Sequence, residues 1–249
     1  GVTAALAGSS ARLKIGAIID PDGDRSRFTD GGTEIGMNQF GALAYYFLHE
    51  KNGLKGLVAK TVATSNLANA VAKGLGEEVF ETKVGFKEFK PVIGKALVCF
   101  EESDGISIIG HTPEKDAYIG LIVALAMVLE SGKNLGELLQ DLELRFGAFY
   151  PDRDGVVVSR SGAELDQALA GLEEYRVGTT LRVGDEEKTI REVIDIDGRK
   201  MIFEDDSWLM IRPSGTEPKV RFYVESRSPD GTGKLVATAR EMLGALGLL

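Results

Sequence analysis

Two kinds of hydrophobic pattern alternate along the first 150 residues. Short runs rich in β-branched residues predict strands, and apolar residues spaced three or four positions apart predict helices. We expect strands at 13–19, 56–59, 78–83 and 96–100, and helices at 38–49, 66–75, 117–129 and 135–146. Thr112 as N-cap and Pro113 at the first helical position are expected to open the third helix. This alternation predicts an α/β domain with a mostly parallel sheet.

The pattern changes near residues 150–155, where we place a domain boundary. Strands then dominate, at 156–159, 180–183, 189–196, 200–204, 208–212 and 220–226, with helices at 162–172 and 233–246. Consecutive short strands followed by a closing helix are typical of an α+β unit. The chain is therefore expected to hold an α/β domain followed by a smaller α+β domain.

Composition narrows the functional classes. The 249 residues include 38 acidic and 29 basic side chains, which gives a formal net charge of −9. A general nucleic-acid or membrane-surface binder needs a basic face, so neither partner is expected. The single cysteine, Cys99, lies in an apolar run and is expected to be a small core residue in a protein of the reducing cytoplasm. The longest apolar stretch, 117–129, is too short to cross a bilayer.

Three aspartates at alternate positions, Asp20, Asp22 and Asp24, follow the first predicted strand. Pro21 and Gly23 help this loop to fold so that the carboxylates converge, and hard oxygen ligands of this kind suit Mg²⁺. Three acids this close would repel one another strongly without a cation. A solvated acidic turn is the alternative interpretation of this loop when it is taken by itself.

A second polar loop lies between the last two predicted strands. Arg212, Ser214, Gly215 and Thr216 combine a guanidinium fork, hydroxyl groups and backbone N–H groups, which together can hold a phosphate dianion. The spacing of a Walker loop is absent. A turn of this composition, taken singly, is more often only a turn.

Two further groups of polar residues follow predicted strands. The segment 101–105 (Glu-Glu-Ser-Asp-Gly) comes directly after the strand at 96–100, and open α/β sheets bind ligands at the carboxyl ends of their strands. Its carboxylates can accept hydrogen bonds from sugar hydroxyls. Cationic side chains lie near other strand ends, at Lys60, Lys87, His111 and Lys115. Taken singly, the acidic segment and the lysines are more often solvated surface groups, and His111 is the better functional candidate.

Together, these motifs resemble those of the α-D-phosphohexomutase family, which includes phosphoglucomutases and phosphomannomutases. The matching segments, in the order of that family, are 20–25, 84–87 (Val-Gly-Phe-Lys), 101–105, 110–116 (Gly-His-Thr-Pro-Glu-Lys-Asp) and 212–219. The resemblance implies the C-terminal portion of a four-domain enzyme. It assigns 1–30 to the end of domain 2, 31–148 to α/β domain 3, and 149–249 to a TBP-like α+β domain 4. The domain that carries the catalytic phosphoserine is then expected upstream of Gly1, as a partner from the same protein.

The resemblance also implies an activity and a set of site residues. The activity is the interconversion of hexose 1-phosphate and hexose 6-phosphate through an enzyme phosphoserine and a hexose 1,6-bisphosphate. Mg²⁺ is implied as the cofactor, held by Asp20, Asp22 and Asp24. Catalytic roles are implied for Arg25, Lys60 and His111. Substrate contacts are implied for Gly85, Glu101, Ser103, Lys115, Arg212, Ser214, Gly215 and Thr216.

The predicted sugar loop bears on the choice of hexose and on activity. Asp104 departs from the glucose-type pattern of the family, which usually has Gly or an aromatic residue there, and Glu102 departs from the mannose-type pattern, which usually has Met. The resemblance thus favours glucose 1-phosphate and glucose 6-phosphate as substrates and leaves mannose phosphates open. Without a phosphoserine loop, the chain by itself is expected to be inactive as a mutase.

Two rival interpretations remain. The chain could be a non-enzymatic module that binds sugar phosphates or regulates a partner, and the sequence upstream of Gly1 would discriminate between this and the enzyme. An unrelated metal-dependent phosphatase is the other rival, although its Asp-x-Asp-x-Thr/Val pattern is not met at Asp20 or Asp22. Release of inorganic phosphate without isomerisation would favour the phosphatase.

Overall fold

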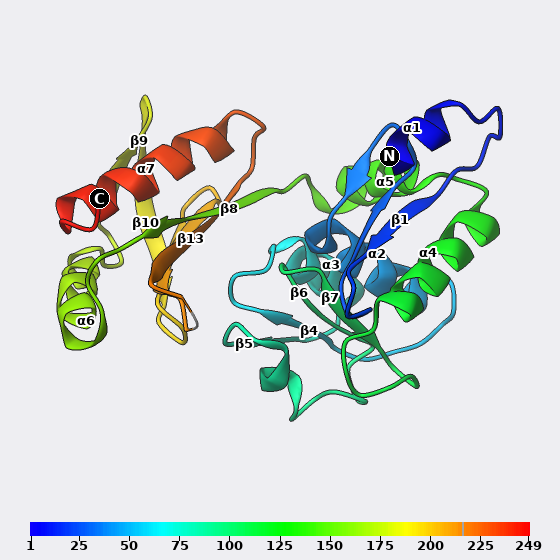
Figure 1. Ribbon diagram of the computed structural model, residues 1–249, viewed down its shortest axis with the longest axis horizontal. Coiled ribbons are helices and arrows are strands. Elements are labelled where there is room, and N and C mark those ends of the chain that lie inside the picture. The colour runs from blue at the N-terminus through cyan, green and yellow to red at the C-terminus, as the bar shows by residue number, and fades with distance from the viewer. Residues whose placement is uncertain (216) are drawn as a thin grey trace. The chain divides into compact units, whose positions relative to one another are not determined.

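Two units divide the computed structural model, which describes residues 1–215 and 217–249 (Figure 1). Unit 1 is Gly1–Ala148 and unit 2 is Phe149–Leu249. The elements of unit 1 are α1 (Val2–Ala7), β1 (Gly16–Ile19), β2 (Ser26–Thr29), β3 (Glu34–Ile35), α2 (Met37–Glu50), β4 (Val58–Thr61), α3 (Leu67–Leu75), β5 (Val79–Thr82), η1 (Phe86–Phe89), β6 (Val98–Glu101), β7 (Gly105–Ile108), α4 (Ala117–Ser131) and α5 (Leu135–Phe146).

The main sheet of unit 1 has the strand order β5-β4-β6-β7. β4 runs parallel to both β5 and β6, and β7 returns antiparallel to β6. Every residue of β4 and β6 is buried, as is usual for strands inside a layered α/β domain. The expected α/β fold with a mostly parallel sheet is therefore confirmed.

Helix α2 packs closely against β6 because residue 41 has no side chain. A Cβ atom at Gly41 would lie 2.2 Å from Cδ2 of Phe100, whose ring is fully buried. On the other side of the strands, the ring of Phe89 in η1 shares a core with Ala59 and Cys99. Both faces of β6 are thus packed, and its carboxyl end is held in place just before residues 102–105.

A smaller antiparallel sheet, in the order β1-β2-β3, completes unit 1. Its first two strands form a hairpin whose connecting loop is 20–25. Asp30 links this sheet to α5, since its carboxylate accepts hydrogen bonds from the N–H groups of Thr33 at 2.8 Å and Gly136 at 2.8 Å. The hairpin is thereby anchored to the rest of the unit.

Unit 2 contains β8 (Tyr150–Val157), α6 (Gly162–Ala170), η2 (Gly171–Glu174), β9 (Thr180–Val183), β10 (Glu186–Ile194), β11 (Arg199–Phe203), β12 (Trp208–Pro213), β13 (Lys219–Ser226) and α7 (Gly231–Ala245). Its antiparallel sheet has the order β8-β13-β12-β11-β10-β9, and α7 lies across it (Figure 1). Leu235, Ala239 and Met242 of α7, spaced at helical intervals, share one core with Leu209 and Phe222 of the sheet. The expected α+β unit is confirmed.

Two boundary predictions were wrong. Helix α4 begins at Ala117 with Asp116 as its N-cap, whose Oδ1 accepts the N–H of Tyr118 at 2.7 Å. Thr112 and Pro113 lie in the preceding loop, because the chain uses residues 109–116 to pass from the end of β7 to the start of α4. The second error concerns β8, which includes Pro151 and begins at Tyr150. Proline is tolerated there because β8 is an edge strand.

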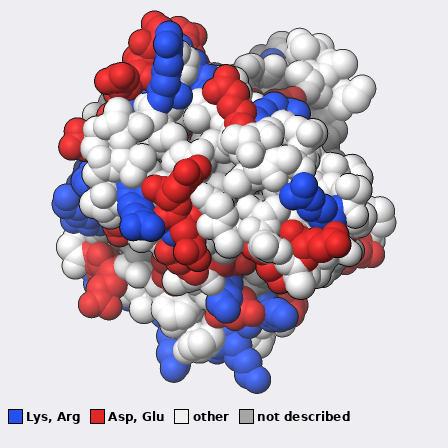
Figure 2. Space-filling model, turned by 90° about the vertical axis from the view of Figure 1, so that its left-hand side faces the viewer, with Lys and Arg blue, Asp and Glu red and all other residues white. Residues whose placement is uncertain are grey.

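The charges of unit 2 are mixed. Ion pairs join Lys188 to Asp205, Arg191 to Asp206 and Lys234 to Asp185. Figure 2, which looks at the molecule from the left-hand side of Figure 1, shows basic and acidic side chains interspersed on that face.

No single helix among residues 1–215 and 217–249 is long and apolar enough to cross a membrane. By length and composition, α4 and α5 meet that requirement only as a pair, and this pair is bent by 79°.

The thiol of Cys99 is expected to be unreactive in the folded chain. The residue is 2% exposed in β6, and burial raises the pKa of the thiol to about 12 from its ordinary value of 9.0. The folded state therefore holds the proton, and this contribution to stability is present below pH 9 and is lost as the pH rises toward 12. Ellman's reagent at about pH 8 should label Cys99 only as fast as unit 1 opens. Labelling of the native chain at the rate of a free thiol would contradict this.

Candidate active site

The loop between β1 and β2 brings three carboxylates together. Ligand atoms of Asp20, Asp22 and Asp24 all lie within 4.8 Å of one another. The turn is held by its own backbone, since the N–H of Gly23 donates to the carbonyl of Asp20 at 3.0 Å. Gly23 has a φ of +74°, which glycine adopts without strain. The turn thus points alternate side chains toward one centre.

The carboxylates of this loop fit a divalent cation. Burial raises the pKa of Asp20, but the N–H groups of Arg25 and Asp24 outweigh it, so the pKa is lowered overall and the ionised form is favoured. In Asp24, one carboxylate oxygen, Oδ1, is buried and has no hydrogen-bond partner. Such an atom normally has a partner, and a magnesium ion would supply one. The other oxygen, Oδ2, is 2.9 Å from Nζ of Lys115.

The loop between β6 and β7 lies directly against the 20–25 loop, which holds the three predicted metal ligands and is called the metal loop below. Arg25 forms an isolated antiparallel bridge with Gly105, and the N–H of Ser26 donates to the carbonyl of Asp104 at 3.0 Å. The guanidinium of Arg27 adds an ion pair, with Nε 2.9 Å from Oδ2 of Asp104. The sequence-predicted metal and sugar loops therefore form one continuous wall within unit 1.

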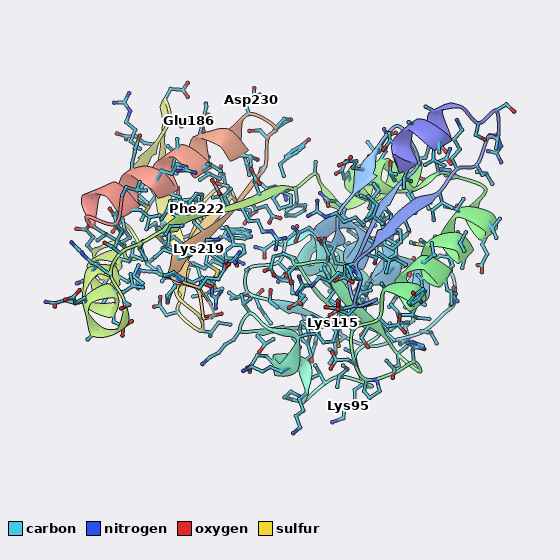
Figure 3. All side chains as sticks on the ribbon, viewed as in Figure 1. Lys95, Lys115, Glu186, Lys219, Phe222 and Asp230 are labelled. Carbon is cyan, nitrogen blue, oxygen red and sulfur yellow. The ribbon has the colours of Figure 1, made fainter. Side chains whose placement is uncertain are left out.

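Lys115 lies between these two loops (Figure 3). Its Nζ is 2.9 Å from Oδ2 of Asp24 and 4.0 Å from Oε1 of Glu101. Glu101 is 4% exposed, and burial, followed by the charge of Glu102, raises the pKa of its carboxyl group. A Cβ atom at Gly105 would lie 3.2 Å from Oε1 of Glu101 and 3.1 Å from Cδ of Lys115. The absent side chain leaves room for both groups.

His111 is held at the start of α4. Its Nε2 is 2.7 Å from Oδ2 of Asp116, the N-cap of that helix. Burial raises the pKa of Asp116, but hydrogen bonds from His111 and from the N–H of Tyr118 lower it, and together with the smaller contributions the net pKa is below its ordinary value. The N–H of Ala117 donates to the carbonyl of Gly23 at 3.0 Å. The first turn of α4 therefore contacts the 20–25 loop through the backbone.

The other predicted site residues of unit 1 have different surroundings. Ser103 is half-buried in the loop after β6, and its hydroxyl group offsets part of the rise that burial causes in the pKa of Glu101. Gly85 has a φ of +127°, and a Cβ atom there would meet nothing within 4 Å. Lys60 is 0% exposed, and its Nζ contacts Oε2 of Glu81 at 2.7 Å. Its catalytic role stays a prediction, and this environment favours a structural one.

In unit 2, Arg212 is the last residue but one of β12 and pairs across the sheet with Arg221 of β13. Its Nε is 3.1 Å from Oδ2 of Asp197. The N–H of Ser214 donates to the carbonyl of Lys219 at 2.8 Å, which closes the loop between the two strands. Gly215 is exposed at the tip of this loop. The predicted contact at Thr216 lies outside the described residues.

Basic side chains flank this second loop. Lys219 and Arg221 both contact the carboxylate of Glu217, at 3.4 Å and 2.5 Å. Glu217 is ionised readily, because the charge of Lys219 lowers its pKa. Both contacts are largely solvent-exposed and hence weak. An anion of higher charge can therefore compete with Glu217 for these cations.

Sequence reasoning missed the residue that orients Arg212. Asp197 lies in the turn between β10 and β11, followed by Gly198 with a φ of +80°. A Cβ atom at Gly198 would lie 2.5 Å from Cβ of Arg212, so this turn approaches the arginine only with glycine at that position. The Asp-Gly pair between two strands was the available signal, since it marks a hairpin turn.

Comparison with known proteins follows the same two parts of the chain. Residues 37–146 match the family model "Phosphoglucomutase/phosphomannomutase, alpha/beta/alpha domain III", and residues 159–242 match "Phosphoglucomutase/phosphomannomutase, C-terminal domain". A phosphoglucomutase/phosphomannomutase of Thermococcus kodakarensis is 30% identical over 223 residues, which cover 86% of this chain and 44% of that protein. A phosphoglucomutase of Komagataeibacter xylinus is 27% identical over 261 residues, covering 98% of this chain and 46% of that protein. The chain thus spans less than half the length of these curated relatives.

Solved structures agree with this result. A structure from Thermus thermophilus, named as a candidate phosphomannomutase, superposes with a TM-score of 0.77 and 27% identity, covering 98% of this chain and 49% of that one. An N-acetylphosphoglucosamine mutase of Aspergillus fumigatus, solved with GlcNAc-6P and magnesium, has a TM-score of 0.62 and 15% identity, covering 96% of this chain and 50% of that one. The second likeness is one of fold alone.

Proposed function

Because the chain belongs to the phosphoglucomutase/phosphomannomutase family, we propose that it forms the metal- and sugar-binding part of an enzyme that moves a phosphoryl group between the 1- and 6-positions of a hexose. The observation that carries this proposal is the contact between the 20–25 and 101–105 loops of unit 1. It joins the Asp20–Asp24 cluster, Lys115 and the buried Glu101 through direct contacts. Metal ligands beside a hydroxyl acceptor are what phosphoryl transfer to a sugar requires.

Asp20, Asp22 and Asp24 would hold Mg²⁺, the ion found in the Aspergillus fumigatus relative. When bound, the ion withdraws negative charge from the phosphoryl group in transfer. Lys115 neutralises one oxygen of Asp24 at 2.9 Å and keeps that carboxylate aligned. Arg25, anchored by its bridge to Gly105, is placed beside the same phosphate.

The remaining residues orient the sugar. Glu101 and Ser103 accept hydrogen bonds from its hydroxyl groups, and the raised pKa of Glu101 also lets the protonated carboxyl donate one. In unit 2, Arg212 and Ser214 bind the phosphate that does not react, with Asp197 holding the guanidinium in place. Glucose phosphates are the favoured substrates, and mannose phosphates are second.

The phosphoserine donor is proposed to lie in an upstream domain of the same protein, in line with this chain's coverage of only 44% and 46% of two curated relatives. The location is proposed as cytoplasmic, in line with the potato relative named "Phosphoglucomutase, cytoplasmic".

Calorimetric titration of glucose 6-phosphate into the 249-residue chain tests the proposal. Arg212→Gln is expected to weaken binding at least about tenfold, since it removes a charge-assisted phosphate contact. Arg191→Gln is the matched control, because this exposed arginine pairs with Asp206 at the opposite end of β12 and should leave affinity unchanged. Equal affinities for the wild type and Arg212→Gln would count against the proposal. Release of inorganic phosphate from glucose 1-phosphate would favour a phosphatase.

A further inference from the structure

Two adjacent buried glutamates at the end of β6 have different surroundings. Glu101 is 4% exposed and lies 4.0 Å from Nζ of Lys115, on the side of the metal loop. Glu102 is 5% exposed and extends instead toward the loop that follows β4. Glu101 is the last residue of β6 and Glu102 is the first residue of the turn that follows, and the two carboxylates contact different neighbours.

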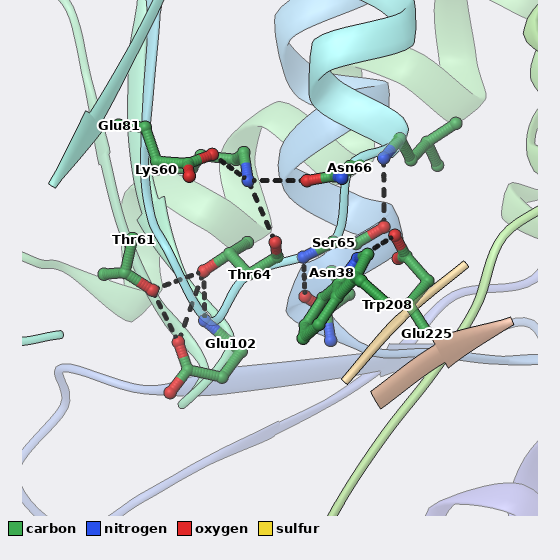
Figure 4. A network of polar contacts seen from close by, with 11 residues as sticks. Asn38, Lys60, Thr61, Thr64, Ser65, Asn66, Glu81, Glu102, Trp208 and Glu225 are labelled. Atoms are coloured by element: carbon green, nitrogen blue, oxygen red, sulfur yellow. Dashed lines mark hydrogen bonds and ion pairs between the residues drawn. The ribbon is translucent and has the colours of Figure 1, made fainter. Parts of the chain in front are cut away.

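Glu102 and two threonines form a closed ring of hydrogen bonds (Figure 4). Its Oε2 accepts from Oγ1 of Thr61 at 2.8 Å and from Oγ1 of Thr64 at 3.2 Å. Its backbone N–H donates to Oγ1 of Thr64 at 3.1 Å. The two hydroxyl oxygens are 2.8 Å apart. We call these three residues the threonine–glutamate ring.

The ring is anchored to the interior of unit 1. Thr61 and Thr64 are both 0% exposed, and the N–H of Thr64 donates to the carbonyl of Thr61 at 3.0 Å. The carbonyl of Thr64 in turn accepts from Nζ of Lys60 at 3.0 Å, and the same ammonium contacts Asn66 at 3.1 Å and Glu81 at 2.7 Å (Figure 4). The ring thus connects β4, β5 and α3 to the loop after β6.

A buried ring of this kind restricts the loop to one conformation. Each hydroxyl has one proton to donate, so losing one threonine hydroxyl leaves a buried carboxylate oxygen short of a donor. The N–H of Glu102 would lose its acceptor at the same time. Any rotation of the loop that carried Glu102 away from β4 would break these bonds together, because they all involve Glu102.

We propose that the threonine–glutamate ring positions the 101–105 loop, and that Glu102 therefore influences sugar binding indirectly, through Glu101 and Ser103. The identity of the ligand in this proposal rests on the proposed function. Glu102 is a positioning residue, because it faces Thr61 and Thr64.

Hydrogen exchange of the 249-residue chain, read by mass spectrometry without ligand, tests the ring. Thr64→Val keeps the shape and removes the hydroxyl, while Thr64→Ser keeps the hydroxyl. Thr64→Val should accelerate exchange in peptides covering 101–105 at least about fivefold, as expected for a lost buried hydrogen bond. Thr64→Ser should exchange as the wild type does in that segment.

Two outcomes would overturn the proposal. The valine and serine variants could exchange alike over 101–105, or the valine variant could accelerate exchange equally throughout unit 1, which would indicate a general loss of stability. A second titration with glucose 6-phosphate should show several-fold weaker binding for Thr64→Val and wild-type binding for Thr64→Ser. If the wild type itself binds no hexose phosphate, the proposed function fails, and the exchange comparison still decides the ring.

Discussion

Replacing Asp24 by asparagine is expected to abolish magnesium binding at millimolar concentrations and, in the full-length enzyme, phosphoryl transfer. The substitution keeps the shape of the side chain but removes one of three converging negative charges. It also changes the buried Oδ1 atom, which has no hydrogen-bond partner. Removal of a direct ligand should weaken the affinity for Mg²⁺ at least about 100-fold.

Calorimetry on the 249-residue chain measures this directly and needs no substrate. Asp141→Asn is the matched control, because this exposed carboxylate of α5 contacts Lys133 at 2.5 Å and lies outside the three-aspartate cluster. The control should bind Mg²⁺ as the wild type does. The same affinity in both variants would show that the loop is an acidic turn with no ion of its own.

The largest loss of stability is expected from Lys60→Met. The lysine is 0% exposed, and its ammonium contacts Glu81, the carbonyl of Thr64 and Asn66. Removing one partner of a buried ion pair leaves the other charge uncompensated, so the free energy of unfolding of unit 1 should fall by about 3–5 kcal/mol. Lys95→Met, at an exposed position, should change it by less than about 0.5 kcal/mol (Figure 3).

The two units can be followed separately in urea. The single cysteine, Cys99, is buried in unit 1, and the single tryptophan, Trp208, is buried in unit 2. Thiol labelling then reports unit 1 and tryptophan fluorescence reports unit 2. Lys60→Met should shift the first transition more than the second. A variant of wild-type stability that had lost ligand binding would instead support the catalytic role implied for Lys60.

Local sequence patterns predicted the helices of both units well. Helix α5 lies at 135–146 as expected, and the capping box of Asn134 and Glu137 explains why it begins there. Helix α3 follows Asn66 and ends at Gly76, whose φ of +75° suits a left-handed C-cap. Such signals lie within a few residues of the element that they define, so a single sequence contains them.

Short strands were not predictable in the same way. β2, β3 and β7 have two to four residues each, and they exist because hairpin partners and α4 pack against them. β7 begins at Gly105, the last residue of the acidic segment 101–105, after which the sequence pattern predicts no strand. β-structure depends on pairing with residues elsewhere in the chain, which no local pattern contains.

By itself, the sequence determined the chemistry of the candidate site: three acids in a tight turn, an acidic loop after a buried strand, and an Arg-Ser-Gly loop between two strands. Only the tertiary structure decided which side chains contact these groups. It placed Lys115 against Asp24, Arg27 against Asp104 and Asp197 against Arg212.

The clearest case is the pair Glu101 and Glu102, which are chemically identical neighbours in the chain. Glu101 ends β6 and lies near Lys115 and the 20–25 loop, whereas Glu102 begins the turn after β6 and is bound by Thr61 and Thr64. Which of the two carboxylates meets the interior depends on the strands that flank β6, and this strand order is a property of the folded sheet.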